Sequence, residues 1–577
     1  MNEVPDDIVV VPEKKIRKFL PEDFSITTWT NLEPYFIQLD KRVIGSLEEL
    51  EKWLLDVSEL ESVFQEDQAW RYIRMTGDTE NREYEEAFNY FASKLELPSA
   101  PYFNSFHKHL LSSRFCSLLP ADKYSIFLRS IKREIEIYRP LNVPLLTRID
   151  VMSQEYARII GSITVVIRDK EMTLQQASNL FKSVDRNLRE QTYRQVRELR
   201  LARRESLDLL FDKLLELRNQ VALNAGFVNF RDYCFAALGR FDYTAEDCFL
   251  LHHSVSEELT PLIGEFDLRR KEMLGLDKLR PWDSEVDLLG RPPLAPFNNA
   301  EELIEKTIQC FNRIDPEFGR YIRIMNKMGH FDLDSHKGKA PGGYNYHLPE
   351  TGVPFIFMNS VGSLRDLVTM VHEGGHAIHS FLCRGLPLKE DKDVPSEIAE
   401  LASMSMELLS MEHWDVFFSN KEDLKRAKME QMEKVLRSLP WICLVDKFQH
   451  WIYEHPIHTH QERGEKWREL ASGFESKVID WSGFEDGRES DWHKQLHIFE
   501  VPFYYIEYAF AQLGAIAVWR NYKRNPDESI LKYKKALSLG YTRSIGELYE
   551  VAGVNFEFSR SYVRELVNFV REEIRKL

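Results

Sequence analysis

The chain lacks the features that mark membrane-spanning, secreted and nucleic-acid-binding proteins. No run of about 18 or more apolar residues occurs, so no membrane span is expected. The N-terminal residues 1–7 show no basic region followed by an apolar run, so no secretory signal is visible. A net charge of −16 disfavours nucleic acid as a partner, because phosphate groups need basic surfaces.

Paired cysteine motifs, internal repeats, low-complexity tracts and glycine-serine linkers are also absent. The six cysteines are scattered, which is typical of reduced, mostly buried thiols in a cytoplasmic protein. The 577 residues are 43% hydrophobic and 29% charged, which predicts a soluble globular chain with a large core.

Long helical segments dominate what is present. Examples are residues 47–57, 175–225, 421–436 and 541–576, and residues 162–174 alternate around a polar turn as in a β-hairpin. We expect a mainly α protein with a large helical body. A helical N-terminal region, 1–200, would carry the short hairpin, and a catalytic region, 201–577, would follow, with a substrate cleft between the two.

The most informative segment is His372-Glu373-Gly374-Gly375-His376. Two histidines four apart on a helix project from one face, so their ring nitrogens can converge on a single Zn²⁺ ion. The glutamate between them would lie beside the open position of the metal and take a proton from bound water. The alternative is a buried helix whose histidines only hydrogen-bond to their neighbours.

The sequence around this motif favours a helix. Ser363 followed by Asp366 predicts a helix-starting cap, and an apolar face at helical spacing follows. Glycine inside a helix costs about 1 kcal/mol relative to alanine. We therefore interpret the Gly374-Gly375 pair as room for a substrate or a neighbouring strand to approach the helix backbone.

His379 is not predicted to be a metal ligand. It lies on the same helix face as His372 but about 10 Å further along the axis. Ligands of one zinc ion lie about 2 Å from it, so His379 is expected to support the site or to pack.

A catalytic zinc ion usually has three protein ligands, so another donor is required. No histidine follows soon after His379, but Glu397, Glu400 and Glu407 lie in a predicted helix that starts near Pro395 and Ser396. Glu400 and Glu407 share a helix face, so one could bind the metal while the other orients a histidine. Apolar neighbours surround Glu400, and spacing alone puts it only slightly ahead of Glu397.

The motif and the segment 400–407 together resemble the thimet oligopeptidase and oligoendopeptidase F metallopeptidases. Residues 240–244, 274–283 and 338–344 are also similar to that family, and the resemblance leans to the bacterial oligoendopeptidase F branch. It implies one Zn²⁺ per chain held by His372, His376 and Glu400, with Glu373 as the base. It also implies a deep cleft that admits only short, unfolded oligopeptides.

One predicted strand and one glycine loop are candidates for substrate binding. Residues 353–359 predict a short apolar strand, and Pro354 favours an edge position because proline cannot donate to a ladder. An edge strand could capture a peptide by strand addition. We expect this strand, with Phe355 and Phe357, and the glycine loop at Gly342 and Gly343 to hold the peptide backbone.

A histidine and tyrosines near residue 500 form the last candidate group. Tyr505 and Tyr508 are three apart, and Tyr504 and Tyr508 four apart, so both pairs are neighbours on a helix. Aromatic core packing is one interpretation. The resemblance implies instead that His497 and Tyr508 or Tyr505 donate hydrogen bonds to the developing oxyanion.

These observations together predict a zinc-dependent metalloendopeptidase that acts on oligopeptides, with no nucleic-acid or membrane partner. Two alternatives stay open. One is a zinc aminopeptidase or carboxypeptidase that uses the same motif. The other is a catalytically silent protein that binds peptides without cleaving them.

Overall fold

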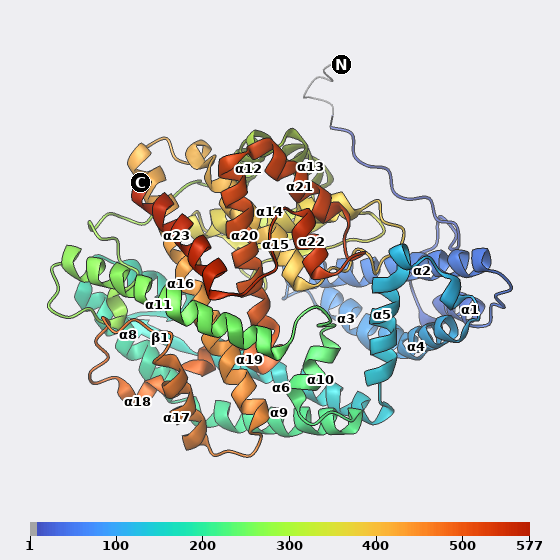
Figure 1. Ribbon diagram of the computed structural model, residues 1–577, viewed down its shortest axis with the longest axis horizontal. Coiled ribbons are helices and arrows are strands. Elements are labelled where there is room, and N and C mark those ends of the chain that lie inside the picture. Colours follow the sequence, from blue (N-terminus) through green and yellow to red (C-terminus); the bar gives the residue numbers. More distant parts are fainter. Residues whose placement is uncertain (1–8) are drawn as a thin grey trace. The chain divides into compact units, whose positions relative to one another are not determined.

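Helices make up most of the computed structural model, which describes residues 9–577 (Figure 1). Its two sheets are small, with two and three strands. The predicted mainly α class is therefore confirmed. Within residues 9–577, no helix combines the length and apolar character needed to cross a bilayer.

The chain folds into two compact units, each built from three separate segments. The first unit contains the described chain up to Glu136, Ala295–Lys428 and Gly514–Phe556. The second contains Ile137–Leu294, Met429–Leu513 and Glu557–Leu577. The predicted domain boundary near residue 200 stays a prediction, as does the cleft.

The first unit holds the segment with the histidine motif. Its helices are α1 (Trp29–Asp40), α2 (Leu47–Gly77), α3 (Arg82–Tyr90), α4 (Leu97–Ser112), α5 (Ala121–Ile137), α12 (Ala300–Ile314), α13 (Pro316–Met328), α14 (Leu364–Cys383), α15 (Ser396–Met411), α21 (Pro526–Ser538) and α22 (Ile545–Val551). A π-helical turn, Phe91–Glu96, joins α3 to α4. Helices α16 (Lys421–Glu454) and α20 (Glu507–Arg524) contribute residues to both units.

A three-stranded sheet in the first unit packs against α14. Its strands are β3 (Phe331–Asp334), β4 (Tyr344–Tyr346) and β5 (Phe355–Ser360), in the order β3-β5-β4. Strand β5 pairs parallel with β3 and antiparallel with β4, so it is the central strand. The predicted edge position of residues 353–359 is therefore wrong. Pro354 lies before the first paired residue, where its missing N–H costs no ladder bond.

The second unit is helical apart from one hairpin. Its elements are α6 (Val143–Gly161), β1 (Thr164–Ile167), β2 (Lys170–Thr173), α7 (Leu174–Ser178), α8 (Arg186–Leu201), α9 (Arg204–Ala225), α10 (Phe230–Ala237), α11 (Ala245–Met273), α17 (His460–Ala471), α18 (Glu485–Arg488), α19 (Leu496–Glu500) and α23 (Arg560–Lys576). Strands β1 and β2 pair antiparallel around Arg168 and Asp169. Both turn residues have positive φ, as the tight turn of a two-residue hairpin requires.

Short 3₁₀ helices occur in both units. They cover Cys116–Leu118, Pro140–Asn142, Asn179–Lys182, Pro281–Asp283, Trp414–Val416, Asp491–Lys494 and Tyr504–Ile506.

The structure divides or extends the predicted helical segments. Residues 175–225 are not one helix, because the side chain of Asp185 caps a new helix at α8 and another break precedes α9. Residues 541–576 contain α22 and α23, with the left-handed Gly553 after α22. Helices α2 and α16 extend well beyond their predicted ends.

Candidate active site

Helix α14 begins where the sequence predicts. The Ser363 side chain accepts a hydrogen bond from the backbone N–H of Asp366, and the Asp366 carboxylate accepts one from the backbone N–H of Ser363 at 2.9 Å. This capping box satisfies two of the otherwise unpaired N–H groups at the helix start. The cap sets the register of α14, so the two motif histidines lie two and three turns further on.

The two glycines of the motif make room for a helix and an aromatic ring. A Cβ atom on Gly375 would lie 2.6 Å from the Cα of Ser403 in α15, and one on Gly374 would lie 2.8 Å from the ring of Phe311 in α12. Room for a substrate or a strand was the wrong interpretation of this pair. Gly375 lets α15 approach α14 closely, and these two helices lie side by side (Figure 1, yellow).

This close approach brings three potential metal ligands together. One ligand atom from each of His372, His376 and Glu400 lies within 4.8 Å of the other two. The Oε2 atom of Glu400 is 3.3 Å from Nε2 of His372 and 3.8 Å from Nε2 of His376. The two imidazole planes are nearly perpendicular, at 89°. Two imidazole nitrogens and a carboxylate oxygen are a donor set that suits Zn²⁺.

Further contacts orient these side chains. The other ring nitrogen of His372, Nδ1, is 2.7 Å from Oε1 of Glu407. Ser403 donates a hydrogen bond of 2.9 Å to Oε2 of Glu400. Glu407 thus orients the His372 ring, a role that the sequence alone left open between Glu400 and Glu407. The contribution of Ser403 was missed, although its i, i+3 spacing from Glu400 was a usable signal.

The electrostatics of the three side chains are strongly coupled. Burial acts to raise the pKa of Glu400, but His376 and His372 outweigh it and hold that pKa at about 2. Burial lowers the pKa of His376 to about 4. Burial acts to lower the pKa of His372, but hydrogen bonds to Glu400 and Glu407 outweigh burial and raise that pKa. Glu400 is therefore an ionised carboxylate and His376 a neutral imidazole, which are the forms that bind a cation, whereas His372 must release a proton before it can bind one.

Glu373 is prepared for proton transfer. This residue is 7% exposed, and in the sequence of α14 it directly follows His372 and precedes His376. Burial raises its pKa to about 7, while the charge of His372 opposes that rise. A carboxylate whose pKa lies near neutral pH can both accept and return a proton.

His379 and Glu397 lie outside this group. His379 is buried, and burial lowers its pKa to about 3. The backbone carbonyl of Glu397 accepts a hydrogen bond from the Tyr549 hydroxyl at 3.0 Å. Neither belongs to the group of ligand atoms around Glu400.

Strand β4 lies against the histidine helix, at the edge of its sheet. Asn345 donates a hydrogen bond of 3.3 Å to the backbone carbonyl of Glu373. Sequence reasoning missed this contact, because a sequence separation of 28 leaves no spacing signal. The side-chain amide of Asn359 donates a hydrogen bond of 2.9 Å to the carbonyl oxygen of Gly342. This bond holds the loop that precedes β4.

The predicted substrate-binding residues differ in their surroundings. Gly342 has a φ of +106° and open space around it, whereas a Cβ on Gly343 would lie 3.3 Å from the carbonyl oxygen of Phe357. Phe355 and Phe357 are 6% and 1% exposed, in a small core with Ala69, Ile73 and Leu348. Both rings are therefore packing residues, and their role in substrate binding stays a prediction.

His497 and the three tyrosines form one aromatic group in the second unit. The ring of His497 lies 4.6 Å from that of Tyr505 and 6.0 Å from that of Tyr508, between centroids. Tyr504 and Tyr508 are 5.5 Å apart. Burial lowers the pKa of His497 to about 4 and raises that of Tyr505 to about 12. A neutral imidazole and protonated phenols are hydrogen-bond donors at neutral pH.

Two family models match the chain. The model described as Peptidase family M3 covers residues 179–568, and the Peptidase M3 N-terminal domain covers residues 19–138. Curated relatives include the oligoendopeptidase F homolog of Borreliella burgdorferi, 23% identical over 57% of this chain and 55% of its own length. Another is oligopeptidase PepF of Bacillus subtilis, 22% identical over 62% of this chain and 54% of its own length. The chain thus spans about half the length of these relatives.

Solved structures match over almost the whole chain. The structure of PZ peptidase A with inhibitor 2 has a TM-score of 0.88 and 28% identity, and covers 97% of this chain and 99% of that one. The oligoendopeptidase F of Enterococcus faecium shares the fold, with a TM-score of 0.62 and 16% identity over 95% of this chain and 97% of that one. Because the family model covers well over half of the residues, the chain belongs to peptidase family M3.

Proposed function

We propose that this protein is a zinc-dependent endopeptidase that cleaves short, unfolded oligopeptides. The observation that carries the proposal is the convergence of Nε2 of His372 and Nε2 of His376 on one carboxylate oxygen of Glu400, with Glu373 buried beside them. Membership of peptidase family M3 and similarity to proteins described as oligopeptidases support it.

The donor set fits one zinc ion per chain. His372, His376 and Glu400 would hold it, and Glu407 would keep the His372 ring in place through Nδ1. Three protein ligands leave a fourth position for water or substrate. Bound Zn²⁺ would supply the Lewis acidity that makes water a nucleophile near neutral pH.

Glu373 would accept the proton of the attacking water and pass it to the amine that leaves. Its raised pKa supports both halves of this task. The hydrogen bond from Asn345 to the Glu373 carbonyl would fix the helix backbone at this point. His497 and Tyr508 or Tyr505 would donate hydrogen bonds to the carbonyl oxygen as negative charge develops on it.

The substrate backbone would bind along β4. This strand is at the sheet edge, and a bound peptide would add a further strand there. Gly342 and Gly343 directly precede β4, and the open space around Gly342 would admit a peptide chain. Phe355 and Phe357 would support β4 from the adjacent strand, where the rings of Tyr344 and Phe357 stack 4.8 Å apart.

A reducing compartment suits this chain. All six cysteines are unpaired, and five of them are buried. We therefore propose a cytoplasmic location, with oligopeptides as the partners.

An internally quenched peptide that is blocked at both ends tests the activity. We expect cleavage that a chelator abolishes and added zinc restores. Cleavage only of peptides with a free terminus would favour the exopeptidase alternative. Zinc content near zero with no cleavage would favour a peptide-binding protein.

The variant Glu373→Gln tests the base. Turnover should fall by about 10²–10⁴-fold, with zinc content unchanged. Glu422→Gln, at an exposed position in the first turn of α16, is the matched control and should keep full activity. Full activity in Glu373→Gln would assign the proton transfer to another residue.

A further inference from the structure

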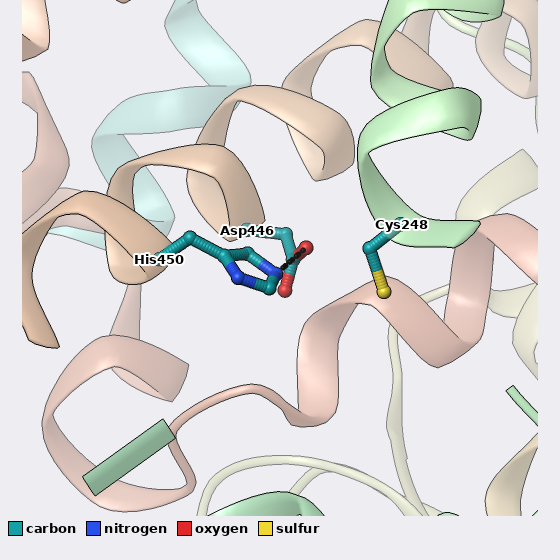
Figure 2. A group of neighbouring side chains, drawn as sticks. All are labelled: Cys248, Asp446 and His450. Carbon is teal, nitrogen blue, oxygen red and sulfur yellow. Dashed lines mark hydrogen bonds and ion pairs between the residues drawn. The ribbon is translucent and has the colours of Figure 1, made fainter. Parts of the chain in front are cut away.

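A second group of metal-binding side chain types lies in the second unit, on helices α11 and α16. Cys248 and His252 are one turn apart on α11, and Asp446 and His450 are one turn apart on α16. One ligand atom from each of Cys248, Asp446 and His450 lies within 4.8 Å of the other two. In Figure 2 the Asp446 carboxylate lies between the His450 ring and the Cys248 sulfur.

The hydrogen bonding of this group is incomplete. Oδ2 of Asp446 is 2.9 Å from Nε2 of His252 and 3.1 Å from Nε2 of His450. Among the described residues, no hydrogen-bond partner exists for Oδ1 of Asp446 or for Nδ1 of either histidine. All four side chains are at most 1% exposed. Buried polar atoms without partners are unfavourable, so their concentration at one place requires an explanation.

The charges around the group favour a cation. The Asp446 carboxylate is fully buried next to the rings of His252 and His450. In the described part of the chain, these two histidines are its ion-pair partners. Arg240, whose charge acts on Cys248, is itself paired with Glu507 at 2.8 Å. An ionised thiol and carboxylate would together balance one divalent ion.

The donor atoms select the type of ion. A thiol sulfur, a carboxylate oxygen and imidazole nitrogens suit Zn²⁺, whereas Ca²⁺ and Mg²⁺ require mainly oxygen ligands. We propose that Cys248, Asp446 and His450 bind a second Zn²⁺ ion that joins α11 to α16, while His252 orients the Asp446 carboxylate through its hydrogen bond of 2.9 Å. This site is independent of the proposed peptidase function.

A structural ion fits the surroundings better than a reactive one. Phe249 and Phe503 lie 4.7 Å and 5.2 Å from the His450 ring, between centroids, and exclude water from that side. The three ligand side chains are at most 1% exposed, so a substrate could not reach the ion. Cys248 is fully buried and therefore is not an accessible nucleophile.

Metal binding requires one proton to leave. In the metal-free chain, burial keeps Cys248 as a thiol by raising its pKa far above the usual value. Formation of the sulfur–zinc bond breaks the S–H bond and releases that proton to solvent, with no change of oxidation state.

Cobalt substitution tests the proposal in the unaltered full-length chain. The His372 site has no sulfur ligand, so a thiolate-to-cobalt charge-transfer band in the near ultraviolet reports only on Cys248. We expect this band on Co²⁺ loading, and Cys248→Ala should abolish it. Cys443→Ala is the matched control, since Cys443 is equally buried on α16 but lies outside the group, and it should keep the band.

Metal content provides the second measurement. The full-length double variant His372→Ala/His376→Ala should retain about one zinc ion per chain, and adding Cys248→Ala or His450→Gln should reduce it to near zero. If the double variant holds no zinc and cobalt produces no thiolate band, the proposal is overturned and the group is a hydrogen-bonded core. A chain that shows the band but cleaves no peptide would contradict only the proposed peptidase function.

Discussion

The Nδ1 atom of His372 lies 2.7 Å from Oε1 of Glu407, on the opposite side of the ring from Glu400. The contact sets which nitrogen of His372 is available for metal, because a ring that donates from Nδ1 presents a bare Nε2. Glu407 thus acts on the site through His372 and is a positioning residue.

The first prediction concerns this contact. Glu407→Gln should weaken zinc binding about 10–100-fold, because an amide orients and polarises the ring less strongly than a carboxylate. Glu400→Ala should lose the metal altogether. Zinc affinity measured by competition with a chromophoric chelator separates the two. An equal loss of zinc affinity in both variants would instead show that Glu407 is itself a metal ligand.

The second prediction concerns the closeness of α14 and α15. Alanine at Gly375 would meet the Ser403 backbone, so Gly375→Ala should destabilise the fold by about 1–3 kcal/mol despite the better helix propensity of alanine. Gly264, inside α11, has no atom within 4 Å of its would-be Cβ. Gly264→Ala should therefore stabilise the fold by about 0.5–1 kcal/mol. Chemical denaturation measures both, and a stabilising Gly375→Ala would show that α15 can move away.

The third prediction identifies the oxyanion donor. Removing the hydroxyl that stabilises the oxyanion should lower kcat about 10²–10³-fold with little change in KM. We expect this result for Tyr508→Phe or for Tyr505→Phe, with the other substitution acting as its control. Steady-state kinetics on the quenched peptide distinguish them. Unchanged kcat in both variants would restrict this aromatic group to packing.

The fourth prediction concerns stability at low pH. Arg564 and Arg560 hydrogen-bond to Glu258 and hold its pKa at about 2, below the ordinary value of about 4.3. Because the folded-state pKa is depressed, the stabilisation is present above about pH 4.3 and is lost as pH falls toward about 2. Glu258→Gln should therefore lower the Tm at pH 7, and the difference from the native chain should shrink below about pH 4.

Glu257→Gln is the control for this pH dependence. Glu257 is more exposed and lies 3.3 Å from Arg560, so the same change in charge should have a smaller effect. Thermal unfolding of the three chains between pH 7 and about pH 3 provides the comparison. A Tm difference for Glu258→Gln that stays constant over this range would exclude the carboxylate as its source.

Local sequence patterns determined the histidine helix and much of the helical content. Ser363 and Asp366 predicted the start of α14, and the four-residue spacing of His372 and His376 placed both rings on one face. These features depend on residues within about two helical turns of each other. Such short-range geometry follows from backbone structure alone.

Tertiary contacts decided the rest of the site. Spacing could hardly separate Glu400 from Glu397, and it was the close packing of α15 against Gly375 that brought Glu400 to the histidines. The same limit applies to β5, which is central because two other strands pair with it, although Pro354 suggested an edge. Sequence determined which side chains share a helix face, whereas the partner of each face depended on how distant segments pack.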